Sequence, residues 1–222
     1  MTRGIFIAGN DSTLSRAVEA AILNKVDQYA AALIPNRLTE VQKTAEPDNI
    51  KRISLDWNPA SPLSARALVL AAENHLEHID EVILICSPPS IRCNPEDLPP
   101  ASVEIMLNDN IKGWFFLIKE ITAVFKERGR GTLALVYPDN NPDHKKNEAA
   151  DVLGPAALAS FRALTQGLLA SAYNEPYITV GFSASDSGND TAFASFINKN
   201  IDELTLRSKG KLFKFGKFNF FR

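Results

Sequence analysis

Short runs of apolar residues alternate with amphipathic stretches along the chain. The apolar runs predict six buried strands and a final one, at residues 3–8, 29–34, 51–56, 81–86, 132–137, 177–182 and within KLFKFGKFNF. Between these runs apolar residues return every three or four positions, which predicts helices after residue 9, after residue 62, over 102–126, from 154 and over 191–203. Continuous apolar strands are typical of a parallel sheet that helices cover on both faces.

This alternation of strand and helix predicts a doubly wound α/β fold of three layers, with a mainly parallel sheet of about seven strands. The chain has 222 residues, a length that suits one domain. The sequence contains no repeat, low-complexity stretch or linker at which a second domain would begin. We therefore expect a single domain over residues 1–222, in which residues 209–222 form the terminal strand and a basic, aromatic tail.

Charge is distributed unevenly along the chain. The formal net charge is −2, yet all six charged side chains from Arg207 to Arg222 are basic, so the preceding part is acidic. An acidic body argues against nucleic-acid binding, which needs a positive face for the phosphates. The tail itself has two readings. In the first, its phenylalanines and basic residues contact the bases and phosphates of a nucleic acid, or a membrane surface. In the second, they form a terminal strand that completes the sheet or a subunit interface. The alternation of residue types favours the strand.

Other bulk features indicate a cytoplasmic protein that does not enter a membrane. No apolar run approaches the roughly 18 residues that a membrane span needs. The apolar stretch near the N-terminus, GIFIAG, is too short for a signal peptide. Cys86 and Cys93 form neither a C-x-x-C pair nor a disulfide framework. His75 and His78 stand one helical turn apart without a strong third ligand, so no metal site is expected.

Five segments, in order, resemble the short-chain dehydrogenase/reductase family from Arg3 to about Phe220. They are IFIAGNDSTLSRAVEAAIL, ISLDWNP, IDEVILICS, LNDNIKGWFFLIKEITAVFKERGRGTLALVY and PAALASFRALTQGL. The first stands at the family's glycine-rich turn, the third at its N-N-A-G motif and the fourth at its V-N-x-K-G helix. The resemblance implies a Rossmann-type fold with NAD or NADP over the carboxyl ends of the strands. It also implies a homo-oligomer, a dimer or tetramer formed through the two long helices at about 102–126 and 154–172.

The same resemblance points to a loss of catalytic residues. In the family a tyrosine exchanges the proton, a lysine four residues later lowers its pKa, and a serine about 13 residues earlier orients the carbonyl. With the chain aligned on AALASF, these positions hold Asp151, Pro155 and Pro138. Asn110 keeps the place of the family's asparagine. The alignment therefore predicts a protein without standard dehydrogenase activity and with a binding or regulatory role.

The cofactor loop is altered as well. The resemblance gives eight candidate cofactor residues, which are Gly9, Asp11, Thr13, Leu14, Arg37, Asp56, Cys86 and Ser87. Thr13 and Ser15 replace two glycines that would let backbone amides approach a pyrophosphate. Asp11 adds a negative charge there, and Asp11 or Ser12 is able to cap the helix in place of an anion. We therefore expect weakened binding of NAD or NADP, and we interpret Arg37 either as a contact to a 2′-phosphate or as a solvated loop side chain.

Two alternative functions stay open at this point. One is an NAD(P)-dependent oxidoreductase that uses non-standard groups, either Tyr137 with Lys145 or Lys146, or Asp151, together with Asn110. The other is an interaction protein that acts through its basic, aromatic C-terminus. Binding of a nicotinamide cofactor would favour the first, and deletion of residues 209–222 would test the second.

Overall fold

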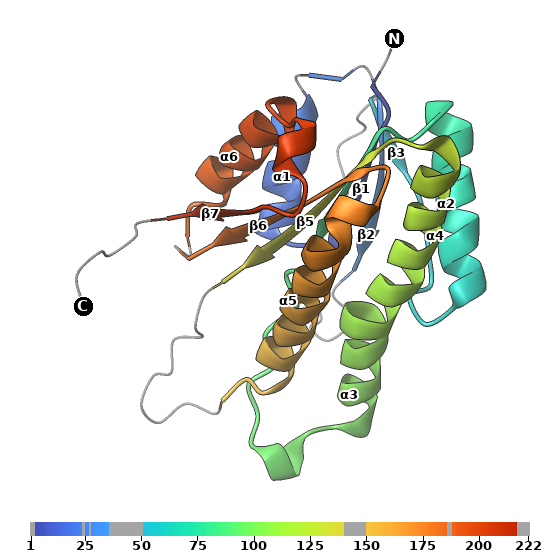
Figure 1. Cartoon of the computed structure of the whole chain (residues 1–222). Helices are drawn as coiled ribbons and strands as arrows, with labels where there is room; N and C mark the ends of the chain where they lie inside the picture. The colour runs from blue at the N-terminus through green and yellow to red at the C-terminus, as the bar shows by residue number, and fades with distance from the viewer. Residues whose placement is uncertain are drawn as a thin grey trace.

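A computed structural model describes residues 3–23, 25–26, 28–35, 51–139, 150–185 and 188–216. Seven parallel strands form one sheet in the order β3-β2-β1-β4-β5-β6-β7 (Figure 1). They are β1 (Ile5–Asn10), β2 (Tyr29–Ile34), β3 (Arg52–Ser54), β4 (Glu81–Ile85), β5 (Thr132–Pro138), β6 (Ile178–Ala184) and β7 (Leu212–Phe215). The predicted doubly wound, Rossmann-type α/β fold with a seven-stranded parallel sheet is confirmed.

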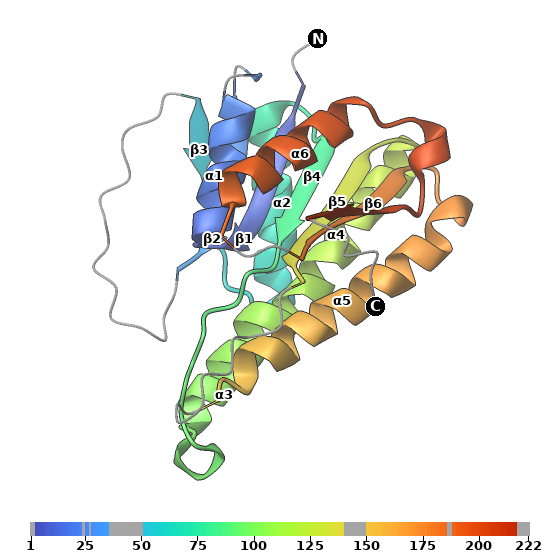
Figure 2. The same ribbon diagram turned by 90° about the vertical axis from the view of Figure 1, so that its left-hand side faces the viewer.

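Helices cover both faces of this sheet, which makes the three predicted layers. On one face lie α1 (Thr13–Leu23) and α6 (Asp190–Asp202), and on the other lie α2 (Pro62–Leu76), α4 (Gly113–Arg128) and α5 (Leu153–Ser171) (Figures 1 and 2). Alternate residues of each strand enter the two resulting cores. In β5, for example, Leu133 and Leu135 face the α4 side, whereas Ala134 and Val136 face the α1 side.

The long helix predicted over 102–126 is not a regular helix. It consists of α3 (Pro100–Leu107), a π-helical turn at Asn108–Lys112, and α4, which ends where Gly129 adopts a φ of 70°. The π-turn lies between the two helical segments and contains Asn110, the motif asparagine. A π-turn widens the helix by one residue and is often found at functional sites. Here it lies beside the carboxyl ends of the strands, and α3 projects beyond them (Figure 2).

The C-terminal aromatic residues complete the core on the α1 and α6 side. Phe213 stacks on Phe182 of β6 with 5.2 Å between ring centroids, and Phe215 stacks on Phe193 of α6 at 5.5 Å. Lys214 lies between them in the strand and is exposed. Residues 212–215 are thus a strand of the sheet, while residues 217–222 lie outside the described part of the chain.

This packing predicts different costs for two neighbouring substitutions in β7. Phe213→Ala removes a half-buried ring from the core and should lower the free energy of unfolding by about 2 kcal/mol. Lys214→Ala removes an exposed side chain and should change that free energy by less than about 0.5 kcal/mol. Urea unfolding of both variants measures the difference. Equal, small effects would show that the tail does not contribute to the core.

Candidate functional site

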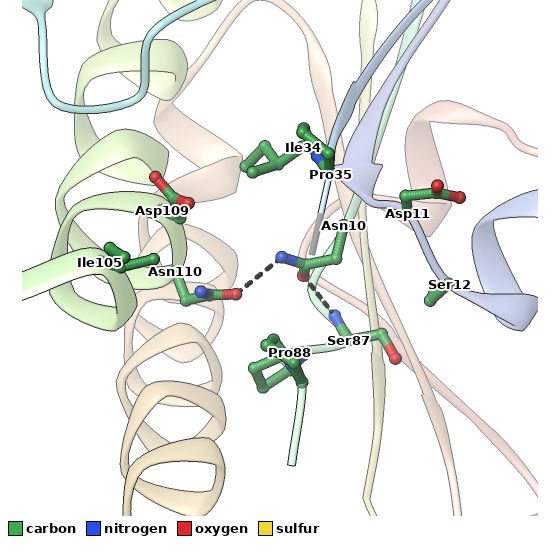
Figure 3. A pocket seen from close by; sticks show the side chains of 11 residues that line it. Asn10, Asp11, Ser12, Ile34, Pro35, Ser87, Pro88, Ile105, Asp109 and Asn110 are labelled. Carbon is green, nitrogen blue, oxygen red and sulfur yellow. Dashed lines mark hydrogen bonds between the residues drawn. The ribbon is translucent and has the colours of Figure 1, made fainter. Parts of the chain in front are cut away.

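A cleft of about 220 Å³ opens at the carboxyl ends of β1, β2 and β4, beside the π-turn. This is the place where β1 stands between β2 and β4 and the strand order reverses, the usual ligand site of an open α/β sheet. The residues that line it are Asn10, Asp11, Ser12, Ile34, Pro35, Ser87, Pro88, Pro89, Ile105, Asp109 and Asn110 (Figure 3).

A chain of two hydrogen bonds crosses the floor of the cleft. The backbone N–H of Ser87 donates to Asn10 Oδ1 at 2.9 Å, and Asn10 Nδ2 donates to Asn110 Oδ1 at 2.7 Å (Figure 3). Asn10 is 5% exposed and Asn110 is 2% exposed, so water does not compete strongly for these bonds. Asn10 therefore joins the end of β1 to the loop after β4 and to the π-turn.

The N-terminus of α1 is capped by the protein's own side chain. Ser12 Oγ accepts from the backbone N–H of Ser15 at 3.2 Å, and Ser15 Oγ donates to the carbonyl of Asn10 at 2.6 Å. The cap by Ser12 is one of the two expected from the sequence. Asp11 instead forms an ion pair with Arg16 at 3.0 Å. An amide that would otherwise bind an anion is thus occupied, and a carboxylate lies next to it.

Five of the candidate cofactor residues lie outside the lining of the cleft, and three of these belong to β1 and α1. Thr13 Oγ1 donates to Asp190 Oδ2 at 2.5 Å and so ties α1 to the start of α6. Leu14 is buried in the core between α1 and the sheet. Gly9 sits so close to β4 that a Cβ there would lie 2.9 Å from the carbonyl oxygen of Ile85. Each of these residues has a structural contact that accounts for its type.

Of the other candidate cofactor residues, two line the cleft, two do not, and one lies outside the described part of the chain. Ser87 lines the cleft, together with Asp11. Asp56 is exposed after β3 and does not line it. Cys86 is fully buried in the core, and burial raises the pKa of its thiol, so it is not a reactive thiolate. Arg37 lies outside the described residues, as do Lys145 and Lys146.

Asp151, at the position aligned with the family's tyrosine, is engaged at the start of α5. Its Oδ1 accepts from the backbone N–H of Gly154 at 3.0 Å, and its backbone pairs with Arg92 in an isolated antiparallel bridge. Pro155 follows in the first turn of α5, where a missing N–H costs little. The carboxylate of Asp151 therefore caps a helix and does not line the cleft.

Tyr137, the alternative proton donor, is buried at the end of β5. It is 1% exposed, and its ring packs edge-on against Phe161 of α5 with centroids 6.2 Å apart. Burial raises the pKa of the phenol and the Asp139 carboxylate raises it further, against the opposing effects of Arg162 and a hydrogen bond with Ser183. A catalytic tyrosine needs a lowered pKa, so the shift has the wrong sign for that role.

Sequence reasoning missed Asn10 and Asp109, which line the cleft and are both nearly buried. A polar residue directly after a buried strand is a signal that could have identified Asn10. Asp109 precedes Asn110 within the π-turn, and its position depends on that turn. Within the described residues no group of three metal-ligating side chains occurs, and none of the described helices is long and apolar enough to cross a membrane.

Two glycines of α5 test the role of Asp151. A Cβ at Gly154 would lie 2.6 Å from Asp151 Oδ2, so Gly154→Ala should lower the free energy of unfolding by about 1–2 kcal/mol. In Gly167→Ala the new Cβ meets nothing within 4 Å, and better helix propensity should raise that free energy by about 0.5–1 kcal/mol. Thermal or urea unfolding gives both values. If both substitutions raised the free energy of unfolding, the hydrogen bond between the Gly154 N–H and Asp151 would not be formed.

Comparison with other proteins supports the fold. No protein-family model and no curated protein matches the chain. Among solved structures, a short-chain type dehydrogenase/reductase from Mycobacterium marinum is similar with a TM-score of 0.73 at 12% identity, over 96% of this chain and 93% of that one. A short chain dehydrogenase from Mycobacterium smegmatis is similar with a TM-score of 0.71 at 10% identity, over 97% of this chain and 92% of that one. The structure of an NADH-dependent reductase, A1-R′, in complex with NAD is similar with a TM-score of 0.70 at 11% identity, over 96% of this chain and 94% of that one. The chain thus has the fold of short-chain dehydrogenases.

Proposed function

We propose that this protein is a binding or regulatory relative of the short-chain dehydrogenases that does not transfer hydride. The observation that carries the proposal is the hydrogen bond from the Gly154 N–H to the Asp151 carboxylate. A side-chain oxygen that accepts from a backbone amide at the start of a helix satisfies a donor that the helix itself leaves unpaired. The group that stands where a proton donor is needed therefore has a structural task.

Acid–base chemistry in this fold also needs a cation beside the donor. Pro155 has no amine, and the part of the cleft lining that the structure describes includes neither lysine nor arginine. A phenol of pKa about 10 is a poor base near neutrality unless a positive charge lies beside it. For Tyr137, burial and Asp139 raise the pKa, and the opposing effects of Arg162 and Ser183 do not reverse that direction. This weakens the alternative of an oxidoreductase built on Tyr137 or Asp151.

Binding of a dinucleotide is disfavoured by charge. The similar reductase was solved with NAD, which makes NAD or NADP the first ligand to consider for this chain. A pyrophosphate at the start of α1 would meet the carboxylate of Asp11 and the cap made by Ser12. Like charges at close range raise the free energy of the complex, and a capped amide cannot donate to a phosphate.

The proposal predicts no detectable binding of NADH or NADPH at millimolar cofactor. Fluorescence and calorimetric titration measure it, with the NADH-dependent reductase A1-R′ as the positive control for the assay. Binding in the micromolar range would contradict the proposal. So would cofactor-dependent turnover of a carbonyl panel that is lost in Tyr137→Phe or Asp151→Asn.

We also propose that the protein associates with itself through α4 and α5, and that it works in the cytoplasm. Phe115 is 51% exposed and Leu107 is 47% exposed on the α3–α4 side. Ala156 and Ala159 on α5 are exposed and small, which allows close approach of a second helix. A two-fold axis would allow the exposed aromatic ring on α4 of one copy to pack against the small residues on α5 of the other.

This arrangement predicts that Phe115→Glu converts the oligomer to a monomer. Tyr173→Glu introduces the same charge at a side chain that is 72% exposed at the far end of α5 and should leave the oligomer intact. Light scattering coupled to gel filtration measures the mass of each variant. A monomeric wild type, or an oligomer that survives Phe115→Glu, would contradict this interface.

A further inference from the structure

The helix that carries Asn110 holds one residue more than a regular α-helix would. In the π-turn the backbone N–H of Gly113 donates to the carbonyl of Asn108, five residues earlier, whereas an α-helix would pair it with Asp109, four residues earlier. One residue of an α-helix corresponds to a rotation of about 100° and a rise of about 1.5 Å. The residues of α3 therefore lie one step away from the places that an uninterrupted α-helix would give them.

The start of α4 is held firmly, whereas α3 is not. Trp114 is fully buried, and its ring packs on Phe161 of α5 with 5.6 Å between centroids. Gly113 lies so close to Pro59 that a Cβ there would be 2.7 Å from the Pro59 Cβ. In α3, by contrast, Met106 is the single buried residue of eight. A change of helical register at the π-turn would therefore move α3 and leave α4 in place.

The sequence at the end of α3 suits two registers. Ile105 lines the cleft, Met106 is 1% exposed and Leu107 is 47% exposed. If the π-turn became α-helical, each residue of α3 would move to the place now held by the residue before it. Leu107 would then be buried in place of Met106, and Met106 would line the cleft in place of Ile105. Leucine and methionine are close in volume, and such exchanges are the best tolerated in a core.

The hydrogen bond between the π-turn and β1 favours the present register. Asn10 Nδ2 donates to Asn110 Oδ1 at 2.7 Å, and both side chains are nearly buried (Figure 3). A change of register would rotate Asn110 about the helix axis and break this bond. It would also move Ile105 to the place of Glu104, which is exposed. These two losses oppose the burial of Leu107, so the observed register is the more stable one.

We propose that the π-turn is a two-state element that couples the cleft to the outer surface of α3. In the π register Asn110 is bonded to Asn10, Ile105 lines the cleft and Leu107 is exposed. In the α register that bond is broken, Met106 lines the cleft and Leu107 is buried. A ligand that contacts the cleft wall binds the two registers unequally and so changes their populations. This holds for any ligand of the cleft, so the inference is independent of the proposed function.

Met106 is a convenient reporter of the register. The chain has two methionines, Met1 and Met106, so methyl-¹³C methionine labelling of the full chain gives two methyl signals. The Met106 signal is the one that Met106→Leu removes. Helix register shifts take microseconds to milliseconds, the range of methyl relaxation dispersion. The dispersion of this signal therefore measures the population of a second register.

Asn110→Ala removes the bond to Asn10 and introduces a better helix former. A buried hydrogen bond contributes enough to change an equilibrium about tenfold, so we expect the second Met106 environment to become at least about tenfold more populated. Ile105→Glu acts in the same direction without touching the bridge, because residue 105 is exposed in the α register. An unchanged Met106 signal in these variants overturns the proposal. Circular dichroism identifies a variant that does not fold, and the other variant then decides the outcome.

Leu107→Asn should act in the opposite direction, because the α register would bury an amide. Added to Asn110→Ala, it should return the second Met106 environment to the wild-type population or lower. Leu70→Asn makes the same change at a leucine of α2 that is 50% exposed and should have no such effect. An equal response to Leu107→Asn and Leu70→Asn would mean that Leu107 does not enter the core, which overturns the proposal.

A crystal structure of the combined Asn110→Ala, Ile105→Glu variant shows the register directly. We expect the Gly113 N–H to donate to the carbonyl of Asp109, with Leu107 buried and Met106 at the cleft wall. A retained bond from Gly113 to Asn108, with Leu107 still exposed, overturns the proposal.

Discussion

The hydrogen-bonded bridge through Asn10 is the interaction on which the rest of the site depends. It joins three segments that are distant in sequence, namely the end of β1, the loop after β4 and the π-turn within the long helix. Both asparagine amides are held away from bulk water, where a hydrogen bond is stronger and a lost partner is costly. The bridge therefore fixes the width of the cleft and the chemical groups that face into it.

The chemistry of the cleft follows from what this bridge and the neighbouring caps leave available. Ser12 and Asp151 each accept from a backbone amide near a helix start, so two places that could hold an anion or a proton donor are occupied by the protein itself. Asp11 pairs with Arg16 at the edge of the cleft, and Asp109 lines the cleft from the π-turn. The fold is that of the short-chain dehydrogenases, and we propose that the side chains at the ligand site serve binding instead of hydride transfer. Fold and function are separable in this way because function resides in the side chains of the site.

The sequence predicted the architecture well because that part of the fold depends on local patterns. EVILIC could be assigned to a covered strand without knowledge of its neighbours, and β4 is indeed buried at all but one position. The π-turn could not be predicted, since α- and π-helical turns share nearly the same spacing of apolar residues. The role of Asn10 could not be predicted either, because its partner is 100 residues away. The sequence allows Asp151 as a non-standard catalytic group, and its hydrogen bond with Gly154 depends on where α5 begins, which the sequence pattern does not define to the residue.

A crystal structure of the protein grown with NADH at millimolar concentration tests the central claim most directly. We expect the Asn10–Asn110 hydrogen bond to persist and the cleft to contain no dinucleotide. A dinucleotide lodged at the carboxyl ends of β1 and β4, with an amine and a phenol side by side above its nicotinamide ring, would contradict the claim that this cleft has given up hydride chemistry.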